Sequence, residues 1–367
     1  MKILYVITSL EGGGAQNLLI DVCAKLNNNN EITVVVLRDL KTYESQLKAL
    51  GIEVILVDIE KKGPLKSIFM LRDIIKQKNI DILHTHLLAA DSIGRLAGLL
   101  CFGKFKIISS MHREDPWREE KKFAYSLLKL FNRITVNCFK RVQLISVSNS
   151  VKAHCIKYEG IKDKKISVLY NFINYENAVK NDPDFIPDEK TDDDFIIVTA
   201  ARLEHGKGHI TILNALKKLS EEQKSKNIHL NILGTGTIKE ELFSFADKNN
   251  IKNINFLGFK TNIYDYLSQA DLFILASECE GQSIAILEAF YCSVPVLASS
   301  IPANAELLCN GENGVLFELN NADDLNGKID SFVKGKIESD KLTKKARDFC
   351  LTLTVENHVN GLIAIYK

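Results

Sequence analysis

The feature that most constrains the fold is segment 270–290, in which two apolar stretches are separated by a polar turn that contains a glycine. Leu272–Leu275 is a short continuous apolar run, typical of a strand buried on both faces of a parallel sheet. From Ile284 onward the apolar residues have helical spacing. The segment therefore predicts a strand, a turn and a buried helix, which is the repeating unit of an α/β fold.

Two carboxylates bracket this turn, Glu280 and Glu288. Because eight residues of helix make slightly more than two turns, we expect both carboxylates to face the same side. Solvated glutamates on a core helix are the alternative, and the apolar neighbours of Glu288 argue against it. Free amides of a first helical turn would also form a site for phosphate or sugar hydroxyls. These amides belong to Gly281, Gln282, Ser283 and Ile284.

The chain has 367 residues, which is too long for one compact core and suits two domains. Its contents of 46% apolar and 25% charged residues are ordinary for a soluble globular protein. The longest apolar runs are too short to span a bilayer, and Met1 leads straight into a predicted strand, so we expect no signal peptide. Eight cysteines without a Cys-x-x-Cys pair predict reduced thiols in the cytoplasm.

The two halves of the chain differ in charge. Residues 1–183 carry 28 Lys and Arg against 19 Asp and Glu, and the remainder carries 19 against 27. The basic half could face an anionic membrane surface, a phosphorylated acceptor or nucleic acid, with dispersed solvated lysines as the plain alternative. Residues 117–139 predict one long or broken helix with an apolar side and several lysines elsewhere. Packing of that apolar side against the sheet is favoured over contact with a membrane.

In the first half, apolar runs alternate with helical patterns, as in a doubly wound sheet. The first run ends in Gly12, Gly13 and Gly14, which allow a ligand to approach the backbone closely. The Gly-x-Gly-x-x-Gly pattern and the acidic residue of a dinucleotide site are missing, which disfavours a nicotinamide cofactor. The predicted strands are Lys2–Thr8, Ile32–Leu37, Glu53–Val57, Ile82–Leu83, Lys106–Ser109, Gln143–Val147 and Val168–Asn171.

Polar residues follow several of these strands, and ligands in such folds bind at the carboxyl ends of strands. His112 follows the fifth strand, but a single histidine there is often structural and counts only in combination. His84 and His86 follow the fourth strand. We expect these two to lie on opposite faces, which argues against a two-histidine metal site, and zinc would need more ligands in any case.

The polar, acidic and proline-broken segment 181–194 predicts a linker. A second α/β series begins at Phe195–Thr199. Arg202 and Lys207 flank the glycine-bearing turn between this strand and the next helix. Two cations at such a turn suit a diphosphate, with bidentate geometry supplied by Arg202. Further predicted strands are Leu230–Leu233 and Val294–Ala298, with Phe256–Phe259 at the end of another segment and a turn and strand within 311–317.

Taken in order, these residues resemble the large family of retaining, nucleotide-sugar-dependent glycosyltransferases of group 1, similar to family 4. The Glu280-x7-Glu288 element together with Arg202 and Lys207 is specific, and the resemblance spans nearly the whole chain. The weaker shared features are the glycine-rich first loop, Ser110-x-His112, Asn171, Gly234-x-Gly236, Leu257-Gly258, Glu306 and Asn313-Gly314.

The resemblance implies the GT-B fold, an α/β architecture of two Rossmann-like parallel-sheet domains facing across a cleft. Residues 1–175 would bind the acceptor, and residues 195–351 would bind the nucleotide sugar. Residues 176–194 would link them, and a terminal helix at 352–367 would cross back to the first domain.

The resemblance also implies roles for single residues. Arg202 and Lys207 would neutralise the donor diphosphate, Glu288 would hold the ribose hydroxyls, and Glu280 with the amides of residues 281–284 would contact the sugar. Gly13 and Gly14 would approach the donor phosphates, and His112 would lie near the anomeric carbon. No metal or other cofactor is expected, because the two cations do that work. The configuration would be retained by front-face attack, with the leaving phosphate taking the proton of the acceptor.

The implied reaction moves a hexose or N-acetylhexosamine, with a UDP-sugar favoured as donor, to a glycan or lipid-linked saccharide in surface polysaccharide synthesis. We expect a cytoplasmic protein that could contact the inner face of the membrane through its basic first domain, and no nucleic acid partner. A UDP-sugar 2-epimerase of the same architecture and a non-catalytic scaffold are the alternatives. The departures from the family pattern are Gln16 for the usual Glu, Phe172 for Gly, and Gln282-Ser283 for a bulky apolar residue and Pro.

Overall fold

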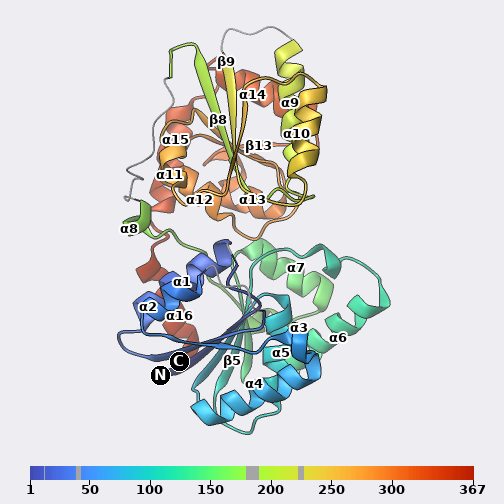
Figure 1. The fold of residues 1–367 in the computed structure, drawn as a ribbon, viewed down its shortest axis with the longest axis vertical. Helices are drawn as coiled ribbons and strands as arrows, with labels where there is room; N and C mark the ends of the chain where they lie inside the picture. The colour runs from blue at the N-terminus through green and yellow to red at the C-terminus, as the bar shows by residue number, and fades with distance from the viewer. Residues whose placement is uncertain (12, 39–42, 179–189, 222–226) are drawn as a thin grey trace. The chain divides into compact units, whose positions relative to one another are not determined.

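The computed structural model describes residues 1–11, 13–38, 43–178, 190–221 and 227–367. The chain forms two compact units (Figure 1). The N-terminal unit contains Met1–Phe172 and the last helix with its flanks, Val355–Lys367, and the C-terminal unit is Ile173–Thr354. Most of the segment expected to be a linker, residues 179–189, lies outside the described residues.

The N-terminal unit is built on a seven-stranded parallel sheet of order β3-β2-β1-β4-β5-β6-β7. Its strands are β1 (Lys2–Ile7), β2 (Glu31–Val36), β3 (Glu53–Leu56), β4 (Ile82–His86), β5 (Lys106–Met111), β6 (Val142–Ser146) and β7 (Ile166–Val168). Its helices are α1 (Gly14–Leu26), α2 (Glu44–Ala49), α3 (Ile59–Lys62), α4 (Pro64–Lys78), α5 (Leu88–Leu99), α6 (Phe123–Cys138), α7 (Asn149–Glu159) and α16 (Val355–Tyr366), with short 3₁₀ turns η1 (Pro116–Arg118) and η2 (Asp163–Lys165).

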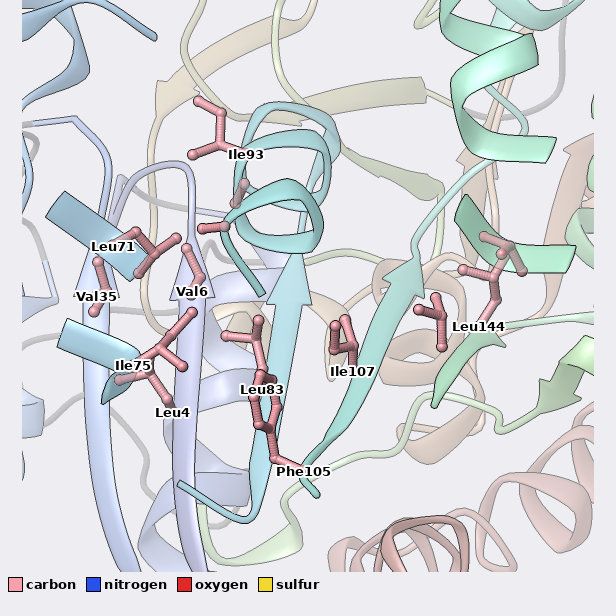
Figure 2. Packing of buried hydrophobic residues seen from close by; sticks show 14 of the residues in the cluster. Leu4, Val6, Val35, Leu71, Ile75, Leu83, Ile93, Phe105, Ile107 and Leu144 are labelled. Carbon is pink, nitrogen blue, oxygen red and sulfur yellow. The ribbon is translucent and has the colours of Figure 1, made fainter. Parts of the chain in front are cut away.

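Strand residues alternate between two buried layers, because successive side chains point to opposite faces of a sheet. Leu4, Val6 and Leu83 face α4, α5 and α7 and form one core with Leu71 of α4 (Figure 2). The opposite face carries Tyr5 and the histidines of β4 and is covered by α1 and α16. Both faces of the sheet are therefore buried, which explains the continuous apolar runs of its strands.

Helix α16 belongs to the N-terminal unit because its buried face packs there. Val359, Leu362 and Tyr366 recur at helical spacing and are buried. The hydroxyl of Tyr366 lies 3.0 Å from that of Tyr5 on β1. An ion pair between Lys25 of α1 and Glu356 of α16 adds a contact at the surface.

Three details differ from the sequence-based expectations. The segment 117–139 takes the broken form of the two predicted, with η1 separated from α6, but the apolar stripe of α6 is exposed instead of packing on the sheet. The expected strand at 168–171 lies earlier, as β7. The placement of His84 and His86 on opposite faces was wrong, since their rings lie 4.3 Å apart on the same face. Residues two apart in a strand share a face, and β4 extends through both histidines.

The C-terminal unit is built on a six-stranded parallel sheet of order β10-β9-β8-β11-β12-β13. Its strands are β8 (Asp194–Ala200), β9 (Asn227–Leu233), β10 (Ile254–Gly258), β11 (Leu272–Leu275), β12 (Val296–Ser299) and β13 (Val315–Phe317). Its helices are α8 (Tyr175–Ala178), α9 (His209–Glu221), α10 (Lys239–Lys248), α11 (Ile263–Leu267), α12 (Ile284–Tyr291), α13 (Pro302–Leu307), α14 (Ala322–Val333) and α15 (Ser339–Cys350), with the 3₁₀ turn η3 (Cys309–Gly311).

This second sheet is also covered on both faces. Ile197 and Ile274 pack with α9 and α14, and Val198 and Leu275 pack with α12 and α15. The apolar run that opened the sequence analysis is therefore the buried strand β11. None of the helices among the described residues is long and apolar enough to cross a membrane.

Candidate functional site

The candidate site of the C-terminal unit lies where the order of its strands reverses. The chain builds outward from β8 through β9 to β10 and then returns to the other side of β8 with β11. Val198 of β8 pairs with Phe273 of β11. Loops that follow such neighbouring strands diverge at the carboxyl edge of the sheet and leave a crevice where ligands bind in open α/β sheets.

The loop from β8 to α9 is held against the end of β11. Gly208 has a φ of +69°, and a Cβ atom there would lie 2.0 Å from the carbonyl oxygen of Ala276. Only glycine fits this position, because the backbone conformation and the lack of space both exclude a side chain. The amide of Glu278 donates to the carbonyl of Gly206 at 2.8 Å. The two loops that carry the predicted cations and carboxylates are thus in direct contact.

This contact brings Lys207 and Glu280 together, 73 positions apart in the chain. The Lys207 Nζ donates to Glu280 Oε1 at 2.6 Å, and the two side chains are 20% and 16% exposed. The side chain of Arg202 is exposed on the same β8–α9 loop. One paired ammonium and one exposed guanidinium are suited to receive a diphosphate, whose charge neither cation could balance alone.

The turn after β11 leads into α12, which begins at Ile284. The hydroxyl of Ser283 accepts from the amide of Ile286 and caps the helix, and Gly281 and Gln282 are buried before it. Glu280 therefore precedes the helix. The expectation that Glu280 and Glu288 share one helical face was wrong, because helical spacing applies only from Ile284 onward.

Glu288 lies on α12 and is half-buried. Burial among apolar side chains disfavours the charged carboxylate and raises the pKa of Glu288 to about 8. The nearby phenol of Tyr264 also has a raised pKa, first through burial and then through the charge of Glu288. Two hydroxyl groups that donate to this carboxyl would favour its ionised form, which is the arrangement that a ribose diol offers.

Sequence reasoning missed the residues that hold the β8–α9 loop. His209 Nε2 lies 3.1 Å from the carbonyl oxygen of Arg202. Glu204 accepts from both the amide and the hydroxyl of Thr237, and these hydrogen bonds lower the pKa of Glu204. A Cβ atom at Gly234 would lie 2.0 Å from the carbonyl of Ala201, so the loop after β9 also packs tightly. The sequence marked this loop by its glycines but contained no signal for the hydrogen bonds.

The N-terminal unit has a second switch point, between β1 and β4, and histidines gather beside it. His112 Nε2 lies 3.0 Å from His86 Nδ1, and their rings are stacked. His84 contacts the hydroxyls of Ser110, at 2.8 Å, and Tyr366, at 2.6 Å. The three histidines and Ser110 border a small cavity beneath α1 and α16. His112 therefore has a structural partner, His86, that sequence reasoning did not assign.

The histidines are neutral at pH 7. Burial and the neighbouring histidines lower the pKa of His84 to about 3, that of His112 to about 4, and that of His86 well below its ordinary value. Among the described residues, His86 Nε2 is buried without a hydrogen-bond partner. An orphaned acceptor costs less than an orphaned N–H group, so we infer that His86 Nδ1 carries its proton and donates to His112 Nε2. The neutral His112 then carries its own proton on Nδ1 and can donate from there.

The glycines of the first loop are placed at the start of α1. Gly13 precedes the helix and Gly14 is its first residue, while Gly12 lies outside the described residues. A Cβ atom at Gly13 would lie 2.8 Å from the side-chain oxygen of Gln16. Gln16 is buried and donates back to the carbonyl of Ser9 at 3.5 Å, so it braces this loop.

Comparison with known proteins matches each unit to a family. Residues 12–177 match the model "Glycosyltransferase Family 4", and residues 181–349 match "Glycosyl transferases group 1". The chain is 26% identical over 314 residues to the capsular polysaccharide biosynthesis glycosyltransferase CapH of Staphylococcus aureus, covering 84% of this chain and 83% of CapH. The two family matches together span most of both units.

The chain belongs to the group 1 glycosyltransferases.

This glycosyltransferase is also similar to the UDP-Gal:alpha-D-GlcNAc-diphosphoundecaprenol alpha-1,3-galactosyltransferase of Escherichia coli. They are 28% identical over 317 residues, covering 82% of this chain and 77% of that enzyme. Among solved structures, Anabaena HepE in complex with UDP matches with a TM-score of 0.82 and 18% identity, covering 100% of this chain and 99% of HepE. A glycosyltransferase from Rickettsia africae matches with a TM-score of 0.80 and 22% identity, over 100% and 98% of the two chains. These likenesses confirm the predicted GT-B fold.

The geometry thus unites some of the predicted site residues of the glycosyltransferase. Lys207 and Glu280 form a pair beside the loop of Arg202, and the start of α12 follows directly. Glu288 stands four residues into that helix. His112 and the loop of Gly13 belong to the N-terminal unit. Within the described residues, no group of three or more His, Cys, Asp or Glu side chains is arranged to hold a metal.

Proposed function

We propose that this glycosyltransferase transfers a hexose or N-acetylhexosamine from a UDP-sugar to a lipid-linked saccharide, with retention of the anomeric configuration, in surface polysaccharide synthesis. The observation that carries the donor assignment is the Lys207–Glu280 pair beside Arg202 at the strand-order reversal of the C-terminal unit. The name of CapH supports a role in surface polysaccharide synthesis, and that of the Escherichia coli galactosyltransferase supports a lipid-linked acceptor. The UDP complex of HepE supports the nucleotide.

In this proposal the cations of the β8–α9 loop bind the donor diphosphate. Arg202 contributes a bidentate guanidinium, and Lys207 contributes a point charge that Glu280 holds in position before the donor arrives. Glu288 accepts from the ribose hydroxyls, and Glu280 with the amides at the start of α12 contacts the sugar. From the N-terminal unit, the backbone at Gly13 and Gly14 approaches the phosphates.

The proposed chemistry needs positioning and charge stabilisation more than a strong base. The bond between the anomeric carbon and the diphosphate oxygen breaks, and the acceptor hydroxyl oxygen bonds to that carbon from the same face. The hydroxyl proton passes to an oxygen of the leaving phosphate. Arg202 and Lys207 stabilise the charge that develops on the diphosphate. Neutral His112 donates from Nδ1 to a hydroxyl of the transferred sugar and does not act as a cation.

Substitution of Lys207 tests the donor site. The wild type should gain thermal stability from UDP in EDTA, more than from GDP, ADP, CMP or NAD. Lys207→Ala should lose this gain and reduce kcat/KM by about 10²–10³-fold, as expected for loss of one preorganised charge contact. Lys218→Ala serves as the matched control. Lys218 is a surface lysine near the end of α9, away from the β8–α9 loop, and it pairs with Asp323 of α14.

Three outcomes would contradict the proposal. Unchanged turnover in Lys207→Ala would contradict the proposed role of Lys207 in binding the donor diphosphate. A free product sugar released from the UDP-sugar without any acceptor would show epimerase chemistry instead of transfer, and failure to bind any nucleotide would show a scaffold.

A further inference from the structure

Helix α6 of the N-terminal unit is oriented with its apolar stripe outward. Phe123, Leu127, Leu130 and Ile134 follow each other at intervals of four, three and four residues, so they line one side of the helix. They are 78%, 52%, 50% and 47% exposed. The side of α6 that is buried carries mainly polar residues, Asn132 and Thr135 with Val136.

A buried polar network explains this orientation. Arg95 of α5, itself 1% exposed, donates to Asn132 at 3.3 Å and to Thr135 at 3.0 Å. Asn132 in turn donates to Glu159 of α7 at 2.5 Å, and Glu159 is paired with the buried Arg118. Groups that are buried and charged must be hydrogen-bonded, so these partners dictate which side of α6 faces inward. The apolar stripe therefore stays on the surface and takes no part in the core of this unit.

The charged residues within segment 121–141 are of one sign. Residues 121–141 contain six Lys or Arg and no Asp or Glu. Lys121 and Lys122 before the helix, Arg133 on its flank and Lys140 after it are exposed. Lys122 forms an ion pair with Glu120, a carboxylate that lies just before this segment. An apolar stripe bordered by cations matches an anionic lipid surface, where the apolar side chains enter the acyl boundary and the cations meet the headgroups.

We propose that α6 is the membrane-contact surface of this glycosyltransferase and lies in the plane of an anionic bilayer. The proposal rests on the proposed function in one respect, since a lipid-linked acceptor requires the enzyme to work at a bilayer. The residues of the surface are Phe123, Leu127, Leu130 and Ile134, with Lys121, Lys122, Arg133 and Lys140.

The test is co-sedimentation of the full chain with vesicles, without donor or acceptor, so that it does not depend on transferase activity. The wild type should bind vesicles that contain phosphatidylglycerol, bind pure phosphatidylcholine more weakly, and lose affinity as salt rises. Leu127→Glu should weaken binding about tenfold or more, because it places a charge in the apolar stripe. Leu65→Glu is the matched control, since Leu65 of α4 is 74% exposed and lies outside α6. This control should bind as the wild type does.

Circular dichroism and thermal melting of each variant establish that it is folded, and Leu130→Ser gives a second variant without a new charge. Three results would overturn the proposal. The wild type could fail to bind anionic vesicles, or Leu127→Glu and Leu130→Ser could bind as well as Leu65→Glu does. Alternatively, the wild type could be a dimer that Leu127→Glu converts to a monomer while vesicle binding is absent, and a second copy of the chain would then be the occupant of the stripe.

Discussion

Glu288 illustrates at the residue scale how packing sets the chemistry of the site. Its carboxyl lies near the phenol of Tyr264, and burial raises its pKa to about 8. For His112 the pKa shifts in the opposite direction, because burial disfavours the charged imidazolium and lowers the pKa of His112 to about 4. Both groups are therefore largely neutral at pH 7 before a ligand binds. In the proposed function, the ribose hydroxyls of the donor make an ionised Glu288 favourable.

The raised pKa of Glu288 predicts a pH-dependent stability. An unfolded glutamate titrates near 4.5 and the folded one near 8, so between these values the folded chain holds a proton that the unfolded chain has lost. The stability that this retained proton contributes is fully present below pH 4.5 and is lost as pH rises through 8. The free energy of unfolding of the wild type should therefore fall relative to that of Glu288→Gln between about pH 5 and pH 9, at about 1.4 kcal/mol per pKa unit and by a few kcal/mol at most.

Urea unfolding of both proteins at the two pH values measures this difference. Glu312→Gln, which removes a carboxyl whose pKa is lowered by Lys345, is the control and should show no such fall. Parallel pH profiles for the wild type and Glu288→Gln would contradict the burial of this carboxyl.

At the scale of elements, the decisive feature is the contact between the β8–α9 loop and the end of β11. Gly208 allows it, because its missing side chain leaves room for the carbonyl of Ala276. The same contact aligns Lys207 with Glu280. The spacing of the two loops is thus set by backbone packing, and the ion pair follows from it.

Gly208→Ala should therefore damage stability and nucleotide binding together. A Cβ atom 2.0 Å from a carbonyl oxygen forces the loops apart in addition to the cost of a positive φ. Gly335→Ala is a matched control, since Gly335 has a φ of +63° and nothing within 4 Å of the added atom. We expect about 1–2 kcal/mol of destabilisation for the control and clearly more for Gly208→Ala.

Chemical denaturation and the melting-point gain from UDP measure both effects. The gain from UDP should persist in Gly335→Ala and shrink in Gly208→Ala. Equal losses of stability in the two variants would contradict this prediction, because they would show that the close approach of the two loops does not add to the cost of the substitution.

At the scale of the whole molecule, the N-terminal unit is assembled from both ends of the chain. Helix α16 covers part of one face of the first sheet, and Tyr366 reaches the hydroxyl of Tyr5 and the ring of His84. Both ends of the chain therefore contribute to the packing around the first sheet, although the C-terminal unit separates them in sequence.

Leu362→Ala tests this dependence. Leu362 is 2% exposed, and truncating such a leucine should cost about 2–5 kcal/mol. Leu351→Ala, at a position that is 45% exposed shortly before α16, should change stability by less than about 0.5 kcal/mol. Because the proposed nucleotide site lies in the C-terminal unit, the melting-point gain from UDP should survive in folded Leu362→Ala. A loss of that gain at temperatures where the variant is folded would contradict the assignment.

Much of the architecture was predictable from local patterns. The apolar runs predicted buried strands of parallel sheets, because a strand covered on both faces needs no polar side. The glycines at Gly208 and Gly234 marked tight strand-to-helix turns. The Arg202, Lys207, Glu280 and Glu288 set pointed to a group 1 glycosyltransferase, and the family comparison confirmed the family and the fold.

The sequence by itself determined the two α/β series and the chemical groups available at their turns, because both are properties of local spacing. Only the tertiary structure decided which side of α6 faces outward, since Arg95, Asn132 and Glu159 come from separate helices and must satisfy one another. Only the fold paired His86 with His112 and raised the pKa of Glu288. The physical reason is the same in each case: hydrogen bonding and desolvation depend on neighbours that are distant in the chain, and local periodicity carries no record of them.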